Sequence, residues 1–492
     1  MLSRIARKSN GRLLQQLRGY ASADAIAAAE QSPFLRFGNP LPQVFNMSQA
    51  LAQLPETQVT RLPNGLRVAS ETVPFANTAT VGVWIDAGSR YETDATNGTA
   101  HFLEHMAFKG TTSRTVKQLE QEIEDMGGHL NAYTSREQTC YYAKVFEKDV
   151  PKALEILSDI LQNSNLDDRA IERERDVILR EMQEVEGIPE EVIFDHLHAT
   201  AFQHSPLGRT ILGPAENVRR LTRENLADYI ATNYTAPRMV VSAAGAIDHG
   251  ALVSAAEKAF SKVPSGGVTA DQLVKQGPAF FTGSDVRIRD PDVPNTHIAI
   301  AFQGASWTDP DSIPLMVMQT MLGAWDKNSG AGSDMGSKLA QRVAINGLAH
   351  SYMAFNTNYH DTGLFGVYAV ADPHSDHEDL TWAIMHELTK MCYNVDEDDV
   401  ARARNQLKAS ILFSQDGTTG VAEDIGRNLL VYGRRLPKAE LFARIDAVDA
   451  PTVKNVAGRF ILDQELAVTA MGDTQFVPDY NWLRRRTYWL RY

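Results

Sequence analysis

Several features that would place this 492-residue chain in a familiar class are scarce or missing. It has only two cysteines, Cys140 and Cys392, which cannot build a disulfide framework and whose spacing fits no zinc knuckle. We therefore expect both to be inert core thiols in a protein of a reducing compartment. No run of about 18 uncharged apolar residues occurs, so we expect no membrane-spanning helix. The net charge of -13 argues against a nucleic-acid partner and is compatible with a basic partner.

What is present describes a globular protein behind an unusual N-terminus. Hydrophobic residues make up 43% and charged residues 22% of the chain, as in proteins with a sizeable core. The first 23 residues instead contain basic side chains and no acid before Asp24. Their leucines and isoleucine can gather on one face of a basic helix, which is typical of a mitochondrial transit peptide. A disordered basic tail is the alternative. Arg18 lies two residues before the Tyr20 position, and we place the end of the transit peptide at residue 20.

The remaining chain repeats itself once. Residues 77–106 contain an Asn-Thr pair, a strand-like segment, a glycine and a helix-like segment, and the same order recurs at 295–321. The buried-strand pattern at 239–245 recurs at 466–472. The pattern predicts an α+β fold of two homologous domains, each an antiparallel-rich sheet with helices packed on it. We place a lead-in at 21–55, a first domain at 56–262, a linker rich in Pro and Gly at 263–282, and a second domain at 283–492.

The segment His101-Phe102-Leu103-Glu104-His105 has the strongest chemical pattern. Helical residues four apart share a face, so the two imidazoles can bind one metal ion. Catalytic zinc uses three protein ligands and keeps one position open for water. Glu104 lies close enough to accept a proton from that water. The order H-x-x-E-H is the inverse of the commoner H-E-x-x-H motif. A chance pair of surface histidines is the alternative.

A third ligand is expected to be a carboxylate from another helix. Glu181 lies 76 residues after His105 (181 - 105) in an acidic helical segment. Glu174 lies two turns earlier on the same face and can orient a histidine through its second ring nitrogen. A solvated, salt-bridged helix is the alternative, and we prefer it for Glu172 and Glu184.

Residues 97–111, NGTAHFLEHMAFKGT, with Glu181 at this spacing, resemble the pitrilysin-type inverzincin metallopeptidases. Within them, the segment resembles the β subunits of mitochondrial processing peptidases and core protein I of the cytochrome bc1 complex. The resemblance implies a fold like half of a clamshell and one Zn²⁺ per chain. It implies His101, His105 and Glu181 as ligands, with Glu104 and Glu174 as the catalytic carboxylates, the first as base and the second in support.

The same resemblance implies substrate contacts. Asn131 and Ala132 match an edge strand that pairs with an extended peptide. Glu191 and Asp195 match an acidic pair that holds an arginine two residues before the cut, and their i, i+4 spacing allows them to share one guanidinium. Phe108 matches the wall of a pocket for an aromatic residue after the cut. For Glu191 and Asp195, an ordinary exposed helix is the alternative.

The second half departs from a complete enzyme. Its segment 315–321, LMVMQTM, has no ligand set, and Val343 and His350 stand where single-chain relatives have an Arg/Tyr pair. Residues 328–336 lack a long glycine-rich loop. We therefore expect a heterodimer with an α subunit that has such a loop, and a mitochondrial location, in the matrix or at the matrix face of the inner membrane.

Three functions fit these observations. The first is a zinc endopeptidase that removes targeting presequences, which are basic peptides, and that is also a core subunit of the cytochrome bc1 complex. The second is a purely structural core protein with a vestigial zinc site. The third is a peptide-degrading homodimer. Because a structural copy is free to lose ligands and this chain keeps all of them, we favour the peptidase. The tail 479–492, DYNWLRRRTYWLRY, suits a protein interface, with packing against its own domain as the alternative.

Overall fold

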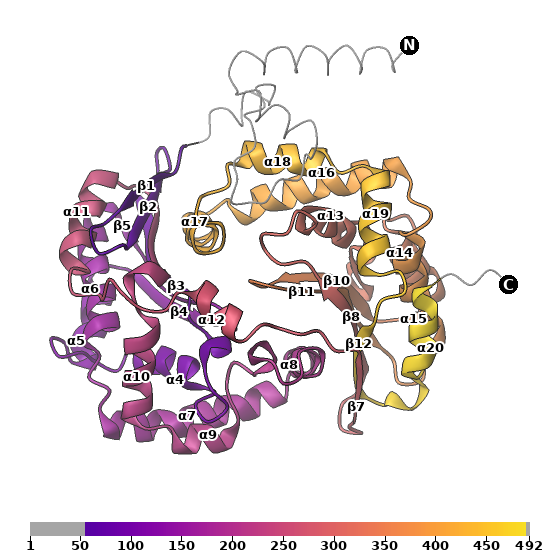
Figure 1. Cartoon of the computed structure of the whole chain (residues 1–492), viewed down its shortest axis with the longest axis horizontal. Helices are drawn as coiled ribbons and strands as arrows, with labels where there is room; N and C mark the ends of the chain where they lie inside the picture. Colours follow the sequence, from indigo (N-terminus) through magenta and orange to yellow (C-terminus); the bar gives the residue numbers. More distant parts are fainter. Residues whose placement is uncertain (1–54, 489–492) are drawn as a thin grey trace, which may run out of the picture.

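The structure is a computed structural model of the chain, and it describes residues 55–488 (Figure 1). The predicted transit peptide and nearly all of the predicted lead-in lie outside the described residues. Within residues 55–488, no helix is long and apolar enough to cross a membrane.

The first half is built on a six-stranded sheet in the order β1-β2-β6-β3-β5-β4. The β2 and β6 strands are parallel, and every other neighbouring pair is antiparallel. Gly65, with φ of 97°, closes the turn between the first two strands, where a side chain would be strained. The strands are β1 Gln58–Arg61, β2 Arg67–Thr72, β3 Thr78–Ile85, β4 His129–Thr134, β5 Thr139–Phe146 and β6 Met239–Gly245.

The second half repeats this sheet in the order β7-β12-β8-β11-β10-β9. Its one parallel pair, β7 with β12, corresponds to β2 with β6. Five strands thus follow the same order in both sheets, which confirms the predicted α+β class with a repeated domain. The strands are β7 Ser284–Arg289, β8 Thr296–Gly304, β9 Ala324–Asp326, β10 Ser351–Asn358, β11 Gly363–Ala371 and β12 Leu466–Gly472.

Helices cover both sheets. Those of the first half and its exit are α4 Thr99–Met106, α5 Val116–Asp125, α6 Val150–Asn163, α7 Asp168–Glu186, α8 Pro189–Ala201, α9 Ala215–Arg220, α10 Arg223–Asn233, α11 His249–Ala259 and α12 Ala270–Gln276. Those of the second half are α13 Ser312–Leu322, α14 Lys338–Asn346, α15 His377–Lys390, α16 Glu397–Ser414, α17 Thr418–Tyr432, α18 Lys438–Asp446, α19 Ala450–Phe460 and α20 Tyr480–Arg484. Short 3₁₀ turns are η1 Ser89–Tyr91, η2 Glu147–Asp149, η3 Pro206–Gly208, η4 Ala236–Arg238, η5 Lys327–Ser329, η6 Thr474–Phe476 and η7 Arg485–Thr487.

The two halves exchange one helix each (Figure 1). Apolar residues of α8, among them Ile193 and Leu197, pack on the second sheet, and those of α17, among them Ile425, pack on the first. Trp84 of β3 lies against Gly426 so closely that a β-carbon there would come 2.4 Å from the indole. Burial of this apolar surface locks the halves together. It also means that a residue on α8 takes its position from both domains.

Three local predictions need comment. The segment 131–147, predicted as strand, belongs to a hairpin of two strands, because residues 135–138 form a turn. The predicted linker 263–282 contains α12, so it is not wholly irregular, and the domain boundaries stay a prediction. The C-terminal segment packs back on its own domain up to residue 488: Leu483 is buried, and the Thr389 hydroxyl donates to the carbonyl of Arg486.

Candidate active site

The α4 helix begins at a tightly fixed turn. Gly98 has φ of 105° and precedes the helix as its N-cap residue. The buried carboxylate of Glu92 accepts hydrogen bonds from the backbone N–H groups of Gly98 (2.9 Å) and Ala100 (2.7 Å) and from the side chain of Asn97 (2.8 Å). The two backbone donors are among those that a helix start leaves unpaired, and a carboxylate there also complements the helix dipole. Burial nevertheless raises the pKa of Glu92 to about 7, against the lowering effect of its three donors.

His101 and His105 leave the same face of α4, and their ring centroids are 4.7 Å apart in a T-shaped arrangement. Helix α7, which Asp167 caps by accepting from the N–H of Ala170, brings Glu181 to them. One Glu181 oxygen, Oε1, lies 3.6 Å from Nε2 of His101, and the other, Oε2, lies 3.0 Å from Nε2 of His105. The structure therefore brings together the three residues that the sequence predicted as ligands.

The donor set fits a zinc ion. The three potential ligand atoms lie within 4.8 Å of one another, and no other such cluster of His, Cys, Asp or Glu occurs in the part of the chain that the structure describes. A tetrahedral zinc ion with bonds of about 2.0–2.2 Å separates its ligand atoms by roughly 3.3–3.6 Å. The separations of 3.6 Å from His101 and 3.0 Å from His105, measured to the two different oxygens of Glu181, lie near that range. Two imidazoles and one carboxylate leave a fourth position for water, as catalytic zinc sites do.

Glu174 stands behind this cluster on α7. Its Oε2 atom lies 3.6 Å from Nδ1 of His105, and its Oε1 atom pairs with Nζ of Lys109 at 2.8 Å. Burial lowers the pKa of His105, but contact with Glu181 and the charges of Glu181, Glu104 and Glu174 outweigh it and raise that pKa. The two imidazoles hold the pKa of Glu181 well below its usual range. The cluster is thus electrostatically suited to a cation.

Glu104 lies between the two histidines in sequence and is half-buried. Within residues 55–488 its carboxylate makes no hydrogen bond or ion pair, so it is available to a proton from a bound water. Burial is the main cause that raises the pKa of Tyr141 on β5, and Tyr234 and the charge of Glu104 add to it. Phe108 follows α4, is half-buried and packs at the border of the first core. Its role in a substrate pocket stays a prediction.

The β4 strand is at the edge of its sheet, because it pairs only with β5. Its outer edge is thus available to a further strand, and the pairing of Asn131 and Ala132 with a peptide stays a prediction. The N–H of Ala132 donates to the neighbouring Oδ1 of Asn131 at 2.8 Å, and the Asn131 amide lies 3.4 Å from the hydroxyl of Tyr142. A peptide strand would therefore replace a local side-chain contact at Ala132.

The predicted acidic pair on α8 is unequal. Glu191 is exposed and, in the described part of the chain, forms no ion pair. Asp195 is already occupied: its Oδ1 lies 2.5 Å from Nη2 of Arg136, and its Oδ2 accepts from the hydroxyl of Thr210 at 2.8 Å. The sequence predicted the pair as one guanidinium site and missed the internal cation.

Two residues that the sequence reasoning missed position the site: Glu92 and Arg136. Glu92 caps α4 across a loop, and Arg136 reaches α8 from the turn after β4. An acid six residues before a helix-capping glycine is a weak signal for Glu92. No periodicity could have found Arg136, because 59 residues separate it from Asp195.

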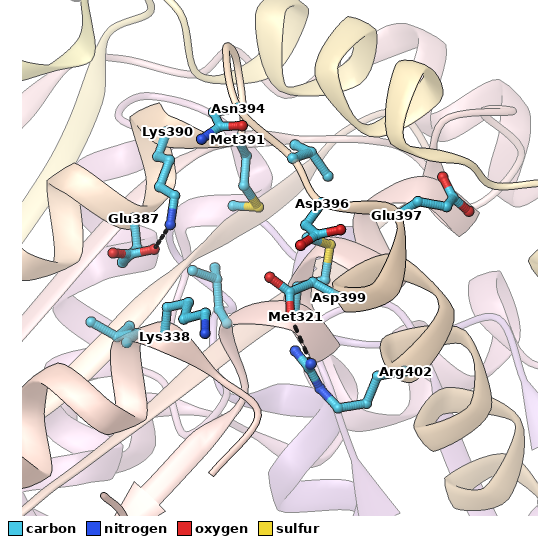
Figure 2. A pocket seen from close by; sticks show the side chains of 13 residues that line it. Met321, Lys338, Glu387, Lys390, Met391, Asn394, Asp396, Glu397, Asp399 and Arg402 are labelled. Atoms are coloured by element: carbon cyan, nitrogen blue, oxygen red, sulfur yellow. Dashed lines mark hydrogen bonds and ion pairs between the residues drawn. The ribbon is translucent and has the colours of Figure 1, made fainter. Parts of the chain in front are cut away.

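The second half has no comparable site among the described residues. Its α13 helix occupies the place of α4, and most of its apolar residues are buried. A cavity of about 440 Å³ lies at the ends of α13, α14, α15 and α16 (Figure 2). Its charged lining is mostly paired, Glu387 with Lys390 and Asp399 with Arg402. None of the predicted site residues lines it, so the candidate chemistry lies elsewhere, on the exposed side of α4 and α7.

Two family descriptions match the chain. Residues 67–215 match "Insulinase (Peptidase family M16)", and residues 220–407 match "Peptidase M16 inactive domain". The first match contains His101, His105, Glu104 and Glu181, and the second contains the ligand-free α13.

Curated relatives are similar over nearly the whole chain. A probable mitochondrial-processing peptidase subunit beta of Arabidopsis thaliana is 63% identical over 93% of this chain and 86% of its own length. The mitochondrial-processing peptidase subunits beta of Neurospora crassa and Homo sapiens are 55% and 50% identical, over 87% and 93% of this chain and 90% and 93% of theirs. Among solved structures, a chain of complex III2 from Candida albicans with Inz-5 bound matches with a TM-score of 0.79 and 26% identity, over 88% of this chain and all of that one.

Proposed function

This chain belongs to the insulinase family of peptidases, peptidase family M16, and on that premise we propose that it is the catalytic subunit of a zinc endopeptidase that removes basic targeting presequences from proteins imported into mitochondria. The observation that supports this most directly is the convergence of His101, His105 and Glu181 from two helices, with Glu104 unpaired beside them. A purely structural role would not require these ligands or Glu104.

Each residue has a distinct part in the proposed reaction. His101, His105 and Glu181 hold one Zn²⁺, which when bound supplies Lewis acidity and an acidified water. Glu104 accepts the proton of the attacking water and returns it to the leaving amide nitrogen. The edge of β4 aligns the peptide by backbone hydrogen bonds, and the acidic residues of α8 favour a basic side chain. Phe108 borders the position after the cut.

The replacement Glu104→Gln tests this mechanism. An amide cannot accept the proton of the water, so we expect cleavage to fall by about two to four orders of magnitude while zinc stays bound. Glu181→Gln removes a ligand, so it should lose the metal as well. Zinc content by elemental analysis and cleavage of a presequence peptide by the assembled enzyme measure both effects. Near wild-type cleavage by Glu104→Gln would refute the mechanism.

The partners follow from what the chain lacks. We infer that an α subunit with a glycine-rich loop completes the enzyme, since the second half of this chain offers no such loop. The proposed location is the mitochondrial matrix or the matrix face of the inner membrane. Residues 1–20, outside the described part, are the proposed transit peptide, and a mature N-terminus that retains Arg4 through Arg18 would contradict it.

A second role rests on the solved relative. That protein is a component of complex III, and we propose that this chain is also a core subunit of the cytochrome bc1 complex. The purely structural alternative is less favoured because the ligands and Glu104 are all retained. Co-purification with haem-bearing subunits from mitochondria tests membership, and zinc-dependent cleavage by the same preparation separates the two roles.

A further inference from the structure

The β4 strand has two faces, and a different half of the chain packs on each. Leu130 and Ala132 pack into the first core together with residues of α4, the helix that bears two of the predicted ligands. Tyr133 packs on the opposite side, against apolar residues of α17 from the second half. Successive side chains of a strand point to opposite faces. A peptide that extends the sheet at β4 therefore points its side chains alternately toward α4 and toward α17.

An ion pair of α17 lies on the second of these faces. Arg427 donates to Oε1 of Glu423, and the hydroxyl of Tyr133 donates to the same oxygen at 3.3 Å. Within residues 55–488 the other oxygen of Glu423, Oε2, accepts no hydrogen bond. The side chains of Glu423 and Arg427 are 36% and 42% exposed, so a bound peptide can reach them. A residue of an added strand comes within about 5 Å of Tyr133 between β-carbons, which brings a long side chain to the ion pair.

The charges of this pair decide which side chain fits beside it. A lysine or a glutamate is attracted by one member of the pair and repelled by the other. An apolar side chain removes water from both charges and gives no hydrogen bond in return. A primary amide donates through its N–H groups and accepts through its oxygen, so it satisfies Oε2 of Glu423 and the guanidinium of Arg427 together.

We propose that Tyr133, Glu423 and Arg427 form a substrate subsite on the α17 side of β4 that takes an uncharged, hydrogen-bonding side chain such as glutamine. Glu423 and Arg427 contact the substrate, and Tyr133 is a positioning residue that holds the carboxylate. The half without a ligand set thus takes part in specificity through the helix that it packs on the first sheet. This inference rests on the proposed function and names a further part of its substrate site.

The test uses the assembled, zinc-loaded enzyme and pairs of presequence peptides. The two peptides of a pair differ at one position near the cut, which is glutamine in one and methionine, of similar length and shape, in the other. Each position near the cut is changed in turn, and the measured quantity is the ratio of kcat/KM within a pair. We expect glutamine to be favoured by about three- to tenfold, the usual effect of a hydrogen bond, at alternate positions only.

Variants of the pair assign this preference to α17. Glu423→Ala/Arg427→Ala should bring the ratio close to one at the favoured positions and leave the zinc content unchanged. Tyr133→Phe keeps the ring but removes the hydroxyl, so it should lower the ratio at the same positions. The control Asp399→Ala/Arg402→Ala removes a pair at the cavity of the second half (Figure 2) and should change nothing.

Single changes should create new preferences, which damage to the fold does not do. Arg427→Gln leaves Glu423 without its cation, so lysine at the favoured positions should be cleaved faster than glutamine. Glu423→Gln leaves Arg427 without its anion, so glutamate there should be favoured instead.

Two results would overturn the inference. One is a glutamine preference that does not alternate along the peptide, and the other is an alternating preference that persists in the Glu423→Ala/Arg427→Ala variant. Failure of the proposed function looks different, because the wild-type enzyme would then cleave no peptide of any pair.

Discussion

At the scale of single residues, the candidate metal site is contacted by a carboxylate that is not itself a predicted ligand. Glu174 lies 3.6 Å from the second ring nitrogen of His105 and is held by Lys109. Partners of this kind fix the orientation of a ligand ring and raise its basicity. Glu174 is buried, whereas Glu172 on the same helix is exposed and pairs with Arg175. The two glutamates therefore form a matched pair for experiment.

We expect Glu174→Gln to weaken zinc binding by about 10–100-fold, because the neutral amide no longer polarises the His105 ring. The measurement is competition for zinc against a chelator of known affinity. Glu172→Gln should change the affinity little, since its exposed carboxylate pairs with Arg175 and not with a predicted ligand. Equal effects of the two substitutions would show that the helix charge, and not the contact with His105, matters.

At the scale of elements, the N-terminus of α4 is the part whose position decides the geometry of the ligands. Glu92 accepts three hydrogen bonds there, and His101 follows Ala100 directly. Glu92→Gln replaces one acceptor oxygen with a donor, so at least one N–H group loses its partner. We expect a loss of about 1–3 kcal/mol of folding free energy, measured by chemical denaturation. The control Glu120→Gln changes an exposed carboxylate on α5 and should have almost no effect.

The elements themselves were largely predictable, and their contacts were not. The H-x-x-E-H spacing placed both imidazoles on one face of a helix, and the structure confirms α4 and the approach of Glu181 on α7. Periodicity is a local property, so it finds such faces. It says nothing of which sheet an apolar helix covers. The exchange of α8 and α17 between the two sheets, and hence the pairing of Asp195 with Arg136, depends on the tertiary fold alone.

At the scale of the whole molecule, the two halves meet in a network of buried charges. His360, in the loop between β10 and β11, donates its backbone N–H to Glu137 of the first half, and its ring lies 2.5 Å from Asp271 of α12. Burial lowers the pKa of His360, but Asp86, Glu137 and Asp271 together raise it above the usual value. The protonated ring therefore stabilises the contact between the halves.

The sign of the pH effect follows from that raised pKa. The stabilisation is fully present below the unfolded value of about 6.5 and is lost as the pH rises through the higher folded value. His360→Gln should lower Tm at pH 6 and have a much smaller effect at pH 9, in thermal unfolding of wild type and variant side by side. In an Asp271→Asn background, the Tm loss caused by His360→Gln should differ less between pH 6 and pH 9. A Tm difference that stays constant with pH would mean that His360 contributes by packing only.

At this scale the candidate site is also open on one side. The side chains of His105 and Glu181 are 21% and 37% exposed, so the candidate zinc site is open on their side, and α13 in the second half has no ligands to add. A peptide bound to such an open face keeps much of its freedom, and the charge that develops on its carbonyl meets water in place of fixed donors.

We therefore expect the purified chain alone to bind about one zinc ion and to cleave presequence peptides at no more than a few per cent of the rate of the assembled enzyme. Adding a partner with a glycine-rich loop should restore cleavage without changing the zinc content, and the same partner added to Glu104→Gln should restore nothing. Full activity of the isolated chain would show that the second half already closes the site.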